Sequence, residues 1–324
     1  MTEVARRRVS LVVPCFNEED ALPLLRDALC SLVDRLESTY EVEAILVDDG
    51  SRDGTWSLIR AYAEKDPWVK GVSLSRNFGH QAALSCGYDW ASGDAVISLD
   101  ADLQDPPEVV LEMLKKWEDG VDIVYAVRTS REGENAFKRA TASLFYRSIR
   151  ALGAEHVRSD TGDFRLMSRR SLEALRRLPE YHRFIRGMVG WIGYRTAEVR
   201  YDRKYRKAGS TKYTTARMMR FAIDAVVSFS IMPLRLAYLA GAILSLGVLC
   251  YLVIASIRYA FWGITLVPGW TSLILAMVGF GTMNLLCVGI MGEYVGRIYE
   301  QSKQRPIYLV IDSSTPPPQP AGPS

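Results

Sequence analysis

Two long stretches without a charged residue constrain the fold of this chain more than any other feature. Residues 236–257 lie between Arg235 and Arg258, and residues 270–292 end at Glu293. Roughly 20 apolar residues are enough to cross the hydrocarbon core of a bilayer as a helix. Two runs of that length so close together are unusual in soluble folds. The sequence therefore predicts two transmembrane helices rather than a pair of buried helices in a soluble protein.

The charges that flank these runs predict their orientation. Residues 128–220, before the first run, hold 23 Lys and Arg against 9 Asp and Glu. Arg297, Lys303 and Arg305 follow the second run, whereas the short loop between the runs holds only Arg258, at its edge. By the positive-inside rule, both flanks face the cytoplasm.

The chain is expected to have four parts. Residues 1–210 form a cytoplasmic domain, 211–233 a juxtamembrane helix, 234–293 the two transmembrane helices, and 294–324 a cytoplasmic tail that is disordered at its end. The cations and apolar residues of 211–233 suit a helix lying in the membrane interface, and an ordinary docking helix is the alternative. The five cysteines form no CxxC motif, which fits a reducing compartment.

The N-terminal part alternates short apolar runs with helical patterns. The apolar runs are 9–13, 44–47, 69–74, 95–99 and 123–127, and the helical stretches lie near 18–37, 53–65, 79–91 and 106–119. Strands that alternate with helices of this length indicate βαβ units. The sequence therefore predicts an α/β fold with a mostly parallel sheet flanked by helices.

Polar side chains gather where these predicted strands end. They are Asn17, Glu18, Asp48, Asp49, Ser75, Arg76, Asp100, Asp102 and Arg128. Ligands of open α/β sheets bind beyond the carboxyl ends of the strands, so these residues predict a site. Neither a GxGxxG fingerprint after the first strand nor a Walker A loop is present, so a bound nucleotide is not held by a glycine loop.

A metal ion could hold the phosphates instead. Asp100, Asp102 and Gln104 alternate along a segment that follows a predicted buried strand, so extended geometry points them the same way. Magnesium or manganese prefers such oxygen ligands and leaves positions for substrate phosphates. A solvated loop is the alternative for such a pair, but its place after a buried strand favours the metal.

Three segments carry a resemblance to a known family. Residues 12–19 (VVPCFNEE), 47–55 (VDDGSRDGT) and 99–104 (LDADLQ) resemble the inverting family 2 glycosyltransferases with the GT-A (Rossmann-like) fold. Within that family the chain is similar to polyprenyl-phosphate glycosyltransferases, which include bactoprenol glucosyltransferases and dolichyl-phosphate mannose synthases. The two C-terminal spans and residues 160–167 (DTGDFRLM) are similar to the bactoprenol glucosyltransferase branch. The QxxRW motif of processive polysaccharide synthases is absent from the sequence, which argues against polymerisation.

The resemblance implies roles for particular residues. The nucleotide-sugar site would be lined by Pro14, Phe16, Glu18, Asp48, Asp100, Asp102 and Arg128. The metal ligands would be Asp100, Asp102 and Gln104, and the catalytic residues Asp163 and Asp102. A basic loop with Arg206, Ser210 and Lys212 would close over the phosphates of donor and acceptor. Because a phosphate acceptor is largely ionised at neutral pH, Asp163 could orient it or balance charge rather than act as a base.

The implied function is transfer of a single sugar to polyprenyl phosphate at a bacterial inner membrane. Glucose from UDP-glucose is expected, and a 4-amino-arabinose derivative or mannose from a GDP donor are alternatives. The resemblance suggests a tetramer, a separate flippase would move the product, and no nucleic acid is expected as a partner. A membrane-anchored nucleotide sensor is the alternative from another class. A transporter is disfavoured, because the two runs contain no charged residue.

Overall fold

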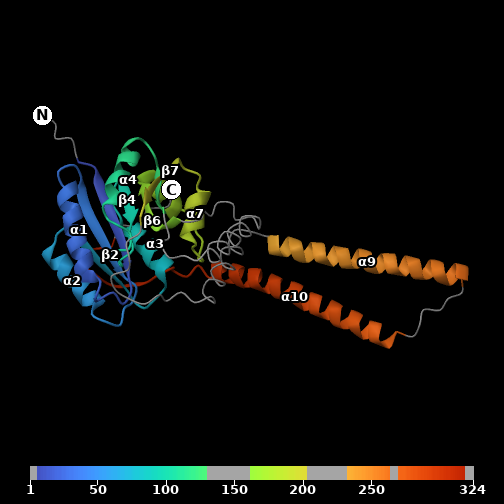
Figure 1. Ribbon diagram of the computed structural model, residues 1–324. Helices are drawn as coiled ribbons and strands as arrows, with labels where there is room; N and C mark the ends of the chain where they lie inside the picture. Colours follow the sequence, from blue (N-terminus) through green and yellow to red (C-terminus); the bar gives the residue numbers. More distant parts are fainter. Residues whose placement is uncertain (1–5, 130–160, 203–231, 263–268, 318–324) are drawn as a thin grey trace. The chain divides into compact units, whose positions relative to one another are not determined.

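A computed structural model of the chain describes residues 6–129, 161–202, 232–262 and 269–317 (Figure 1). It divides into two compact units. The first contains the N-terminal part of the chain and the residues from Arg305 onward, and the second contains two long apolar helices. The predicted juxtamembrane helix falls almost entirely outside the described residues.

One mixed sheet forms the centre of the first unit. Its strands, within the described residues, follow the order β7-β5-β6-β4-β1-β2-β3-β8. Their bounds are β1 Arg8–Cys15, β2 Glu41–Asp48, β3 Val69–Leu74, β4 Ala95–Ser98, β5 Ile123–Arg128, β6 Thr161–Ser168, β7 Thr196–Tyr201 and β8 Val310–Ser313. β1 to β4 pair in parallel, as does β5 with β7, while β6 and β8 pair antiparallel to their neighbours. The predicted mostly parallel sheet is confirmed.

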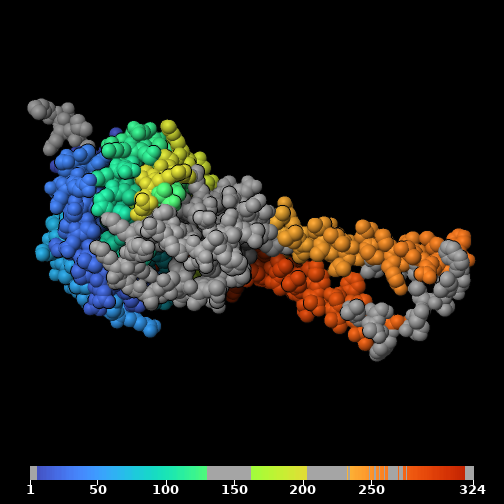
Figure 2. Space-filling model, in the orientation of Figure 1, coloured from blue at the N-terminus to red at the C-terminus, as the bar shows by residue number. Residues whose placement is uncertain are grey.

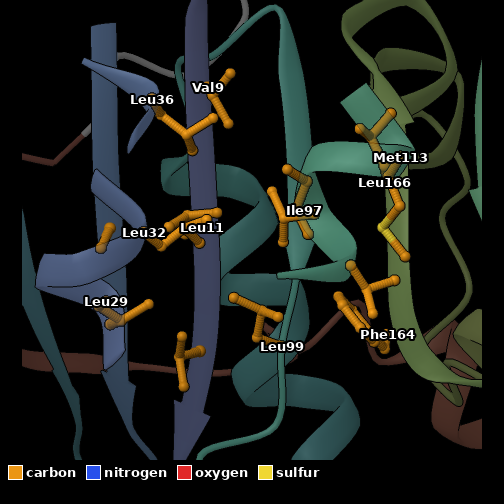
Figure 3. Close-up of a cluster of buried hydrophobic side chains, with 14 of the residues drawn as sticks. Val9, Leu11, Leu29, Leu32, Leu36, Ile97, Leu99, Met113, Phe164 and Leu166 are labelled. Atoms are coloured by element: carbon orange, nitrogen blue, oxygen red, sulfur yellow. The ribbon is translucent and has the colours of Figure 1, made fainter. Parts of the chain in front are cut away.

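Helices cover both faces of this sheet. They are α1 Leu22–Leu36, α2 Thr55–Lys65, α3 His80–Trp90, α4 Val109–Glu118, α6 Arg169–Arg176 and α7 Ile185–Trp191. On one face, Val9 and Leu11 of β1 pack in a single apolar cluster with Leu29 and Leu32 of α1 and Met113 of α4 (Figure 3). Successive side chains of a strand point to opposite faces of the sheet. One alternating set of β1 residues therefore packs into this core, and the other set packs under α3 on the opposite face.

Gly87 lets α3 approach the opposite face closely. A Cβ atom at this position would lie 2.2 Å from Cγ1 of Val12 and 3.3 Å from Cγ2 of Val47. Both valines belong to the sheet, and packed interiors have no room for such an overlap. The close approach fixes α3, whose first residue, His80, lies at the carboxyl edge of the sheet.

The strand order places a switch point between β1 and β4. The chain adds β2 and then β3 on one side of β1, and β4 lies on its other side. Open α/β sheets bind their ligands at such a point, beyond the carboxyl ends of the strands. The loops that follow β1 and β4 therefore frame the candidate site.

The C-terminal strand β8 was not predicted from the sequence. It follows α10 and extends the sheet by pairing antiparallel with β3, which covers an edge that would otherwise expose unpaired backbone groups. Beside it, the hydroxyl of Tyr308 donates a hydrogen bond to Oδ2 of Asp89 at 2.8 Å. Burial raises the pKa of Asp89 above its ordinary value, and this hydrogen bond opposes the shift.

Replacing Tyr308 with Phe is expected to lower the free energy of unfolding by about 1 kcal/mol, because the half-buried carboxyl group of Asp89 loses a hydrogen-bond donor. Thermal unfolding of the full chain in detergent measures the change. Tyr299, whose ring is largely exposed, provides the matched control as Tyr299→Phe. Equal unfolding temperatures for wild type and Tyr308→Phe would show that this contact does not hold the tail.

The second unit consists of α9, Met232–Trp262, and α10, Trp270–Ser302. Two segments, Leu234–Arg258 and Ala276–Ser302, are long and apolar enough to cross a membrane. Apolar side chains are exposed along both segments, among them Ile243, Ile254 and Leu285. Figure 2 draws the two helices as space-filling atoms. So much exposed apolar surface needs a cover of lipid or protein.

Candidate active site

The loops that follow β1 and β2 hold one another in place. Asn17 has a left-handed backbone with a φ of 52°, which Asn adopts more readily than most residues. Its N–H donates to Oγ of Ser51 at 2.9 Å, and the N–H of Arg52 donates to its Oδ1 at 2.9 Å. The N–H of Glu18 donates to Oγ1 of Thr55 at 2.9 Å. This network joins the two loops at the rim of the candidate site.

Three residues predicted to line a nucleotide pocket lie in or directly after β1 and β2. Pro14 is part of β1, and Phe16, just beyond the strand, leaves 38% of its surface exposed. Asp48 ends β2 and is buried; its Oδ1 accepts from the N–H of Ser51 at 3.0 Å, and its Oδ2 from the hydroxyl of Ser73 at 3.0 Å. Asp48 therefore ties the loop after β2 to β3.

Asp49 organises the segment that leads into α3. Its carboxylate is buried and accepts hydrogen bonds from the N–H groups of Phe78, at 2.8 Å, and Gly79, at 3.0 Å. Gly79 has a φ of 98°, which glycine adopts without strain. The two bonds and this turn place His80 at the start of the helix, facing the site.

Asp100 and Asp102 follow β4 in a turn, not in the extended segment that the sequence predicts. The N–H of Gln104 donates to Oδ1 of Asp102 at 3.2 Å, and Leu103 between them has a left-handed φ of 53°. Such a backbone is uncommon for Leu and marks a position that the surroundings impose. Burial first, and then the carboxylates of Asp163, Asp105 and Asp102, raise the pKa of Asp100 to about 6, although His80 lowers it.

This acidic pair suits a divalent cation. Mg²⁺ is commonly bound through one or two carboxylates, with substrate phosphates and water completing its coordination. In the described part of the chain, no group of three His, Cys, Asp or Glu residues could hold a metal by itself. Two neighbouring carboxylates are nevertheless a fitting donor set for a cation that arrives with a diphosphate.

The raised pKa of Asp100 predicts how metal binding depends on pH. A carboxylate must lose its proton to bind a metal. Mn²⁺ affinity is therefore expected to fall about tenfold for each pH unit below about 6, and to level off above that value. Titration of the full chain with Mn²⁺, monitored by the electron paramagnetic resonance signal of the free ion, measures it. A constant affinity across this range would contradict the assignment of Asp100.

Arg128 ends β5 close to a buried carboxylate. Its Nε donates to the hydroxyl oxygen of Tyr201 at 3.3 Å, and that hydroxyl donates to Oδ1 of Asp105 at 2.6 Å. The Nη2 atom of Arg128 lies 3.8 Å from the same carboxylate oxygen. Tyr201 and Asp105 thus fix the guanidinium that the sequence predicts to lie near the phosphates.

Asp163, in β6, is the centre of a cluster of cations. Its Oδ1 accepts from Nη2 of Arg165 at 2.6 Å and from Nε of Arg186 at 3.1 Å. Its Oδ2 accepts from Nη2 of Arg186 at 2.9 Å and lies 3.2 Å from Nε2 of His80. Burial opposes the charge, yet the guanidinium of Arg186, the hydrogen bond to His80 and the guanidinium of Arg165 hold the pKa of Asp163 well below its ordinary value.

Sequence reasoning missed His80 and Arg186. His80 comes from α3 and Arg186 from α7, more than 100 residues apart in the chain, and only the fold brings them together. The predicted phosphate-binding residues Arg206, Ser210 and Lys212 lie outside the described residues.

An acidic pair thus lies at the switch point of a mostly parallel sheet, with the cluster around Asp163 beside it, and such groups suit the binding of a phosphate-bearing ligand. The family model described as "Glycosyl transferase family 2" matches residues 10–176, and the chain belongs to this family.

Two relatives and one solved structure illustrate the similarity. Glycosyltransferase YkcC of Bacillus subtilis is 42% identical over 94% of this chain and 93% of its own length. A protein named bactoprenol glucosyl transferase, of Shigella phage SfV, is 39% identical over 94% of this chain and 98% of its own length. Glucosyl-3-phosphoglycerate synthase from Mycobacterium tuberculosis has 19% identity and a TM-score of 0.49, over 68% of this chain and 78% of that one.

Proposed function

We propose that this enzyme transfers one glucose from UDP-glucose to undecaprenyl phosphate, with inversion, at the cytoplasmic face of a bacterial inner membrane. The observation that carries the proposal is full-length similarity to proteins named bactoprenol glucosyl transferase, such as the 39% identity to that of phage SfV. The similarity spans both the sheet and the apolar helices. A long isoprenoid stays in the bilayer, so an enzyme that uses it needs a site at the membrane surface.

The acidic half of the site would hold the donor. Asp100 and Asp102, with Gln104, would bind Mg²⁺ or Mn²⁺, which would offset the negative charge that grows on the departing diphosphate. Arg128, fixed by Tyr201 and Asp105, would neutralise part of the remaining phosphate charge. Pro14, Phe16, Glu18 and Asp48 would line the pocket for base and ribose.

The acceptor needs little help to become a nucleophile. The second pKa of a phosphate monoester is about 6, so its oxygen is already largely ionised at neutral pH. Asp163 is a poor proton acceptor because its pKa is held well below its ordinary value. Its role in the proposal is therefore electrostatic: it holds cations beside the metal carboxylates. Arg206, Ser210 and Lys212 would close over the phosphates.

The proposal extends to the assembly and the membrane. The two apolar helices would cross the bilayer with both termini in the cytoplasm, because their flanks are rich in Lys and Arg. A homotetramer and a separate flippase for the lipid-linked product are parts of the same proposal. Crosslinking in detergent tests the tetramer, and a single monomer band would contradict it.

A donor panel tests the sugar and the nucleotide. The purified full chain is given undecaprenyl phosphate, Mg²⁺ or Mn²⁺, and one labelled donor at a time: UDP-glucose, UDP-linked 4-amino-arabinose derivatives or GDP-mannose. Lipid-linked product is expected from UDP-glucose and is expected to disappear with a chelator. Product from another donor instead would replace glucose by that sugar and keep the reaction class.

A membrane-anchored nucleotide sensor is the second candidate. It would retain the nucleotide pocket and transfer no sugar. Nucleotide binding without lipid-linked product from any donor would favour it. The intact acidic pair at the switch point favours the enzyme.

A further inference from the structure

The cation cluster around Asp163 separates into a buried part and an exposed part. The side chains of Arg165 and Asp163 are 1% and 6% exposed, and their ion pair measures 2.6 Å. The side chains of Arg186 and His80 are 28% and 44% exposed, although both contact the same carboxylate. The buried pair joins opposite charges, and the two residues that reach solvent, Arg186 and His80, are the hydrogen-bond donors of the exposed part.

This exposed part lies beside the metal carboxylates. Asp100 interacts electrostatically with both His80 and Asp163, and His80 interacts in turn with Arg186. β6, which carries Asp163, is the neighbour of β4, after which Asp100 and Asp102 follow. An anion bound at Arg186 and His80 would therefore lie next to the donor phosphates without using the acidic pair.

We propose that Arg186 and His80 bind the phosphate group of the lipid acceptor, and that Asp163 is the positioning residue that holds both side chains. The inference rests on the proposed function and deepens it, because it assigns the acceptor a binding site. A phosphate monoester carries a charge of about −1.5 to −2 at pH 7 and three acceptor oxygens. The planar guanidinium of Arg186 matches such a group better than an ammonium does.

The arrangement of Asp163 supports positioning rather than proton transfer. The carboxylate meets Arg186 at two atoms, through Nε at 3.1 Å and Nη2 at 2.9 Å. This bidentate contact fixes the plane and the direction of the guanidinium. A carboxylate so placed would repel a phosphate if it were alone, but Arg165 beneath it offsets its charge.

Binding of farnesyl phosphate to the full chain in detergent, with UDP and Mn²⁺ present, tests the inference. Wild type is expected to bind farnesyl phosphate and not farnesol, and inorganic phosphate only weakly. Arg186→Gln is expected to weaken farnesyl phosphate binding about tenfold or more, which is the size of a lost charged hydrogen bond. UDP affinity should stay within about twofold of wild type, because the donor is held by other residues.

Further variants separate positioning from folding. Arg186→Lys keeps the charge and loses the planar guanidinium, so its affinity for farnesyl phosphate should fall between those of wild type and Arg186→Gln. His80→Gln should weaken this binding less than Arg186→Gln does. The double variant Asp163→Asn/Arg165→Met removes one buried charge of each sign. If Asp163 positions Arg186, this double variant should fold and still bind farnesyl phosphate poorly. Arg170→Gln is the matched control, since Arg170 pairs with Asp122, which lies just before β5 at the end of that strand opposite to Arg128.

Wild-type affinity for farnesyl phosphate in Arg186→Gln would overturn the inference, whether or not UDP affinity falls. Equal binding of farnesol and farnesyl phosphate by wild type would also overturn it, because recognition would then rest on the isoprenoid part of the ligand and not on its phosphate. A wild type that transfers no sugar but binds farnesyl phosphate through Arg186 would refute the proposed function and leave a lipid-phosphate site that is not an acceptor site.

Discussion

Asp102→Asn is expected to lower the rate of sugar transfer by about a hundredfold or more. Partners that only orient metal ligands are already worth about 10- to 100-fold in metal affinity or activity, and a ligand should be worth at least as much. The loss should come with weaker Mn²⁺ binding. Single-turnover transfer at saturating donor, together with Mn²⁺ titration, measures both effects.

The fold should survive this substitution. Asp102 adds to the repulsion that raises the pKa of Asp100, so its removal relieves like charge. Asp119→Asn is the matched control, because Asp119 is exposed at the C-terminal end of α4. Full activity in Asp102→Asn, with unchanged Mn²⁺ affinity, would refute the metal site.

Asp163→Asn is expected to lower the free energy of unfolding by about 3–5 kcal/mol, because the buried guanidinium of Arg165 keeps its charge and loses its partner. The Nε and Nη1 atoms of Arg165 have no hydrogen-bond partner among the described residues, so they offer no compensation. The corresponding fall in unfolding temperature is on the order of 10 °C for a domain of this size. Differential scanning calorimetry in detergent measures it.

Two comparisons check the cause of this loss. Adding Arg165→Met to Asp163→Asn should recover much of the stability, because an apolar residue replaces the orphaned charge. Asp122→Asn should cost less, since its partner Arg170 has a side chain 67% exposed and keeps its contact with water. If the double variant unfolds no later than the single one, the buried pair is not the cause.

The pH dependence of this contribution follows from the lowered pKa of Asp163. A carboxyl group whose pKa is lower in the folded state than in the unfolded chain stabilises the fold above its unfolded pKa, about 3.9. That contribution is lost as the pH falls further, through the folded pKa. The stability difference between wild type and Asp163→Asn should therefore be constant near neutral pH and shrink only in strong acid.

The first five strands could be predicted because the sequence repeats a simple pattern there. Val69–Leu74, for example, is both the predicted run and the observed β3. β6 could not be predicted in the same way, because its segment carries Asp163 and Arg165, and charged residues in a strand suggest exposure. The two are buried as a pair, which a hydrophobic pattern cannot reveal. β8 depends on pairing with β3 across more than 230 residues of chain.

The candidate site likewise combines residues that the sequence points to and residues that it does not. Asp100 and Asp102 could be proposed from the sequence, because the pair is local in sequence and its chemistry is specific. His80 and Arg186 could not, because a lone His and a lone Arg carry no signal of their own. Their meaning comes from the carboxylate of Asp163, which the fold brings within 3.2 Å of one and 2.9 Å of the other. Tertiary contacts of this kind are invisible to spacing rules.

Transfer of labelled glucose from UDP-glucose to undecaprenyl phosphate by the purified full chain tests the central claim most directly. The account predicts an organic-soluble glucosyl lipid that forms with wild type and Asp119→Asn, and that is absent with Asp102→Asn or with a chelator. It is contradicted if folded wild type that binds UDP forms no lipid-linked sugar from UDP-glucose or from any other donor of the panel.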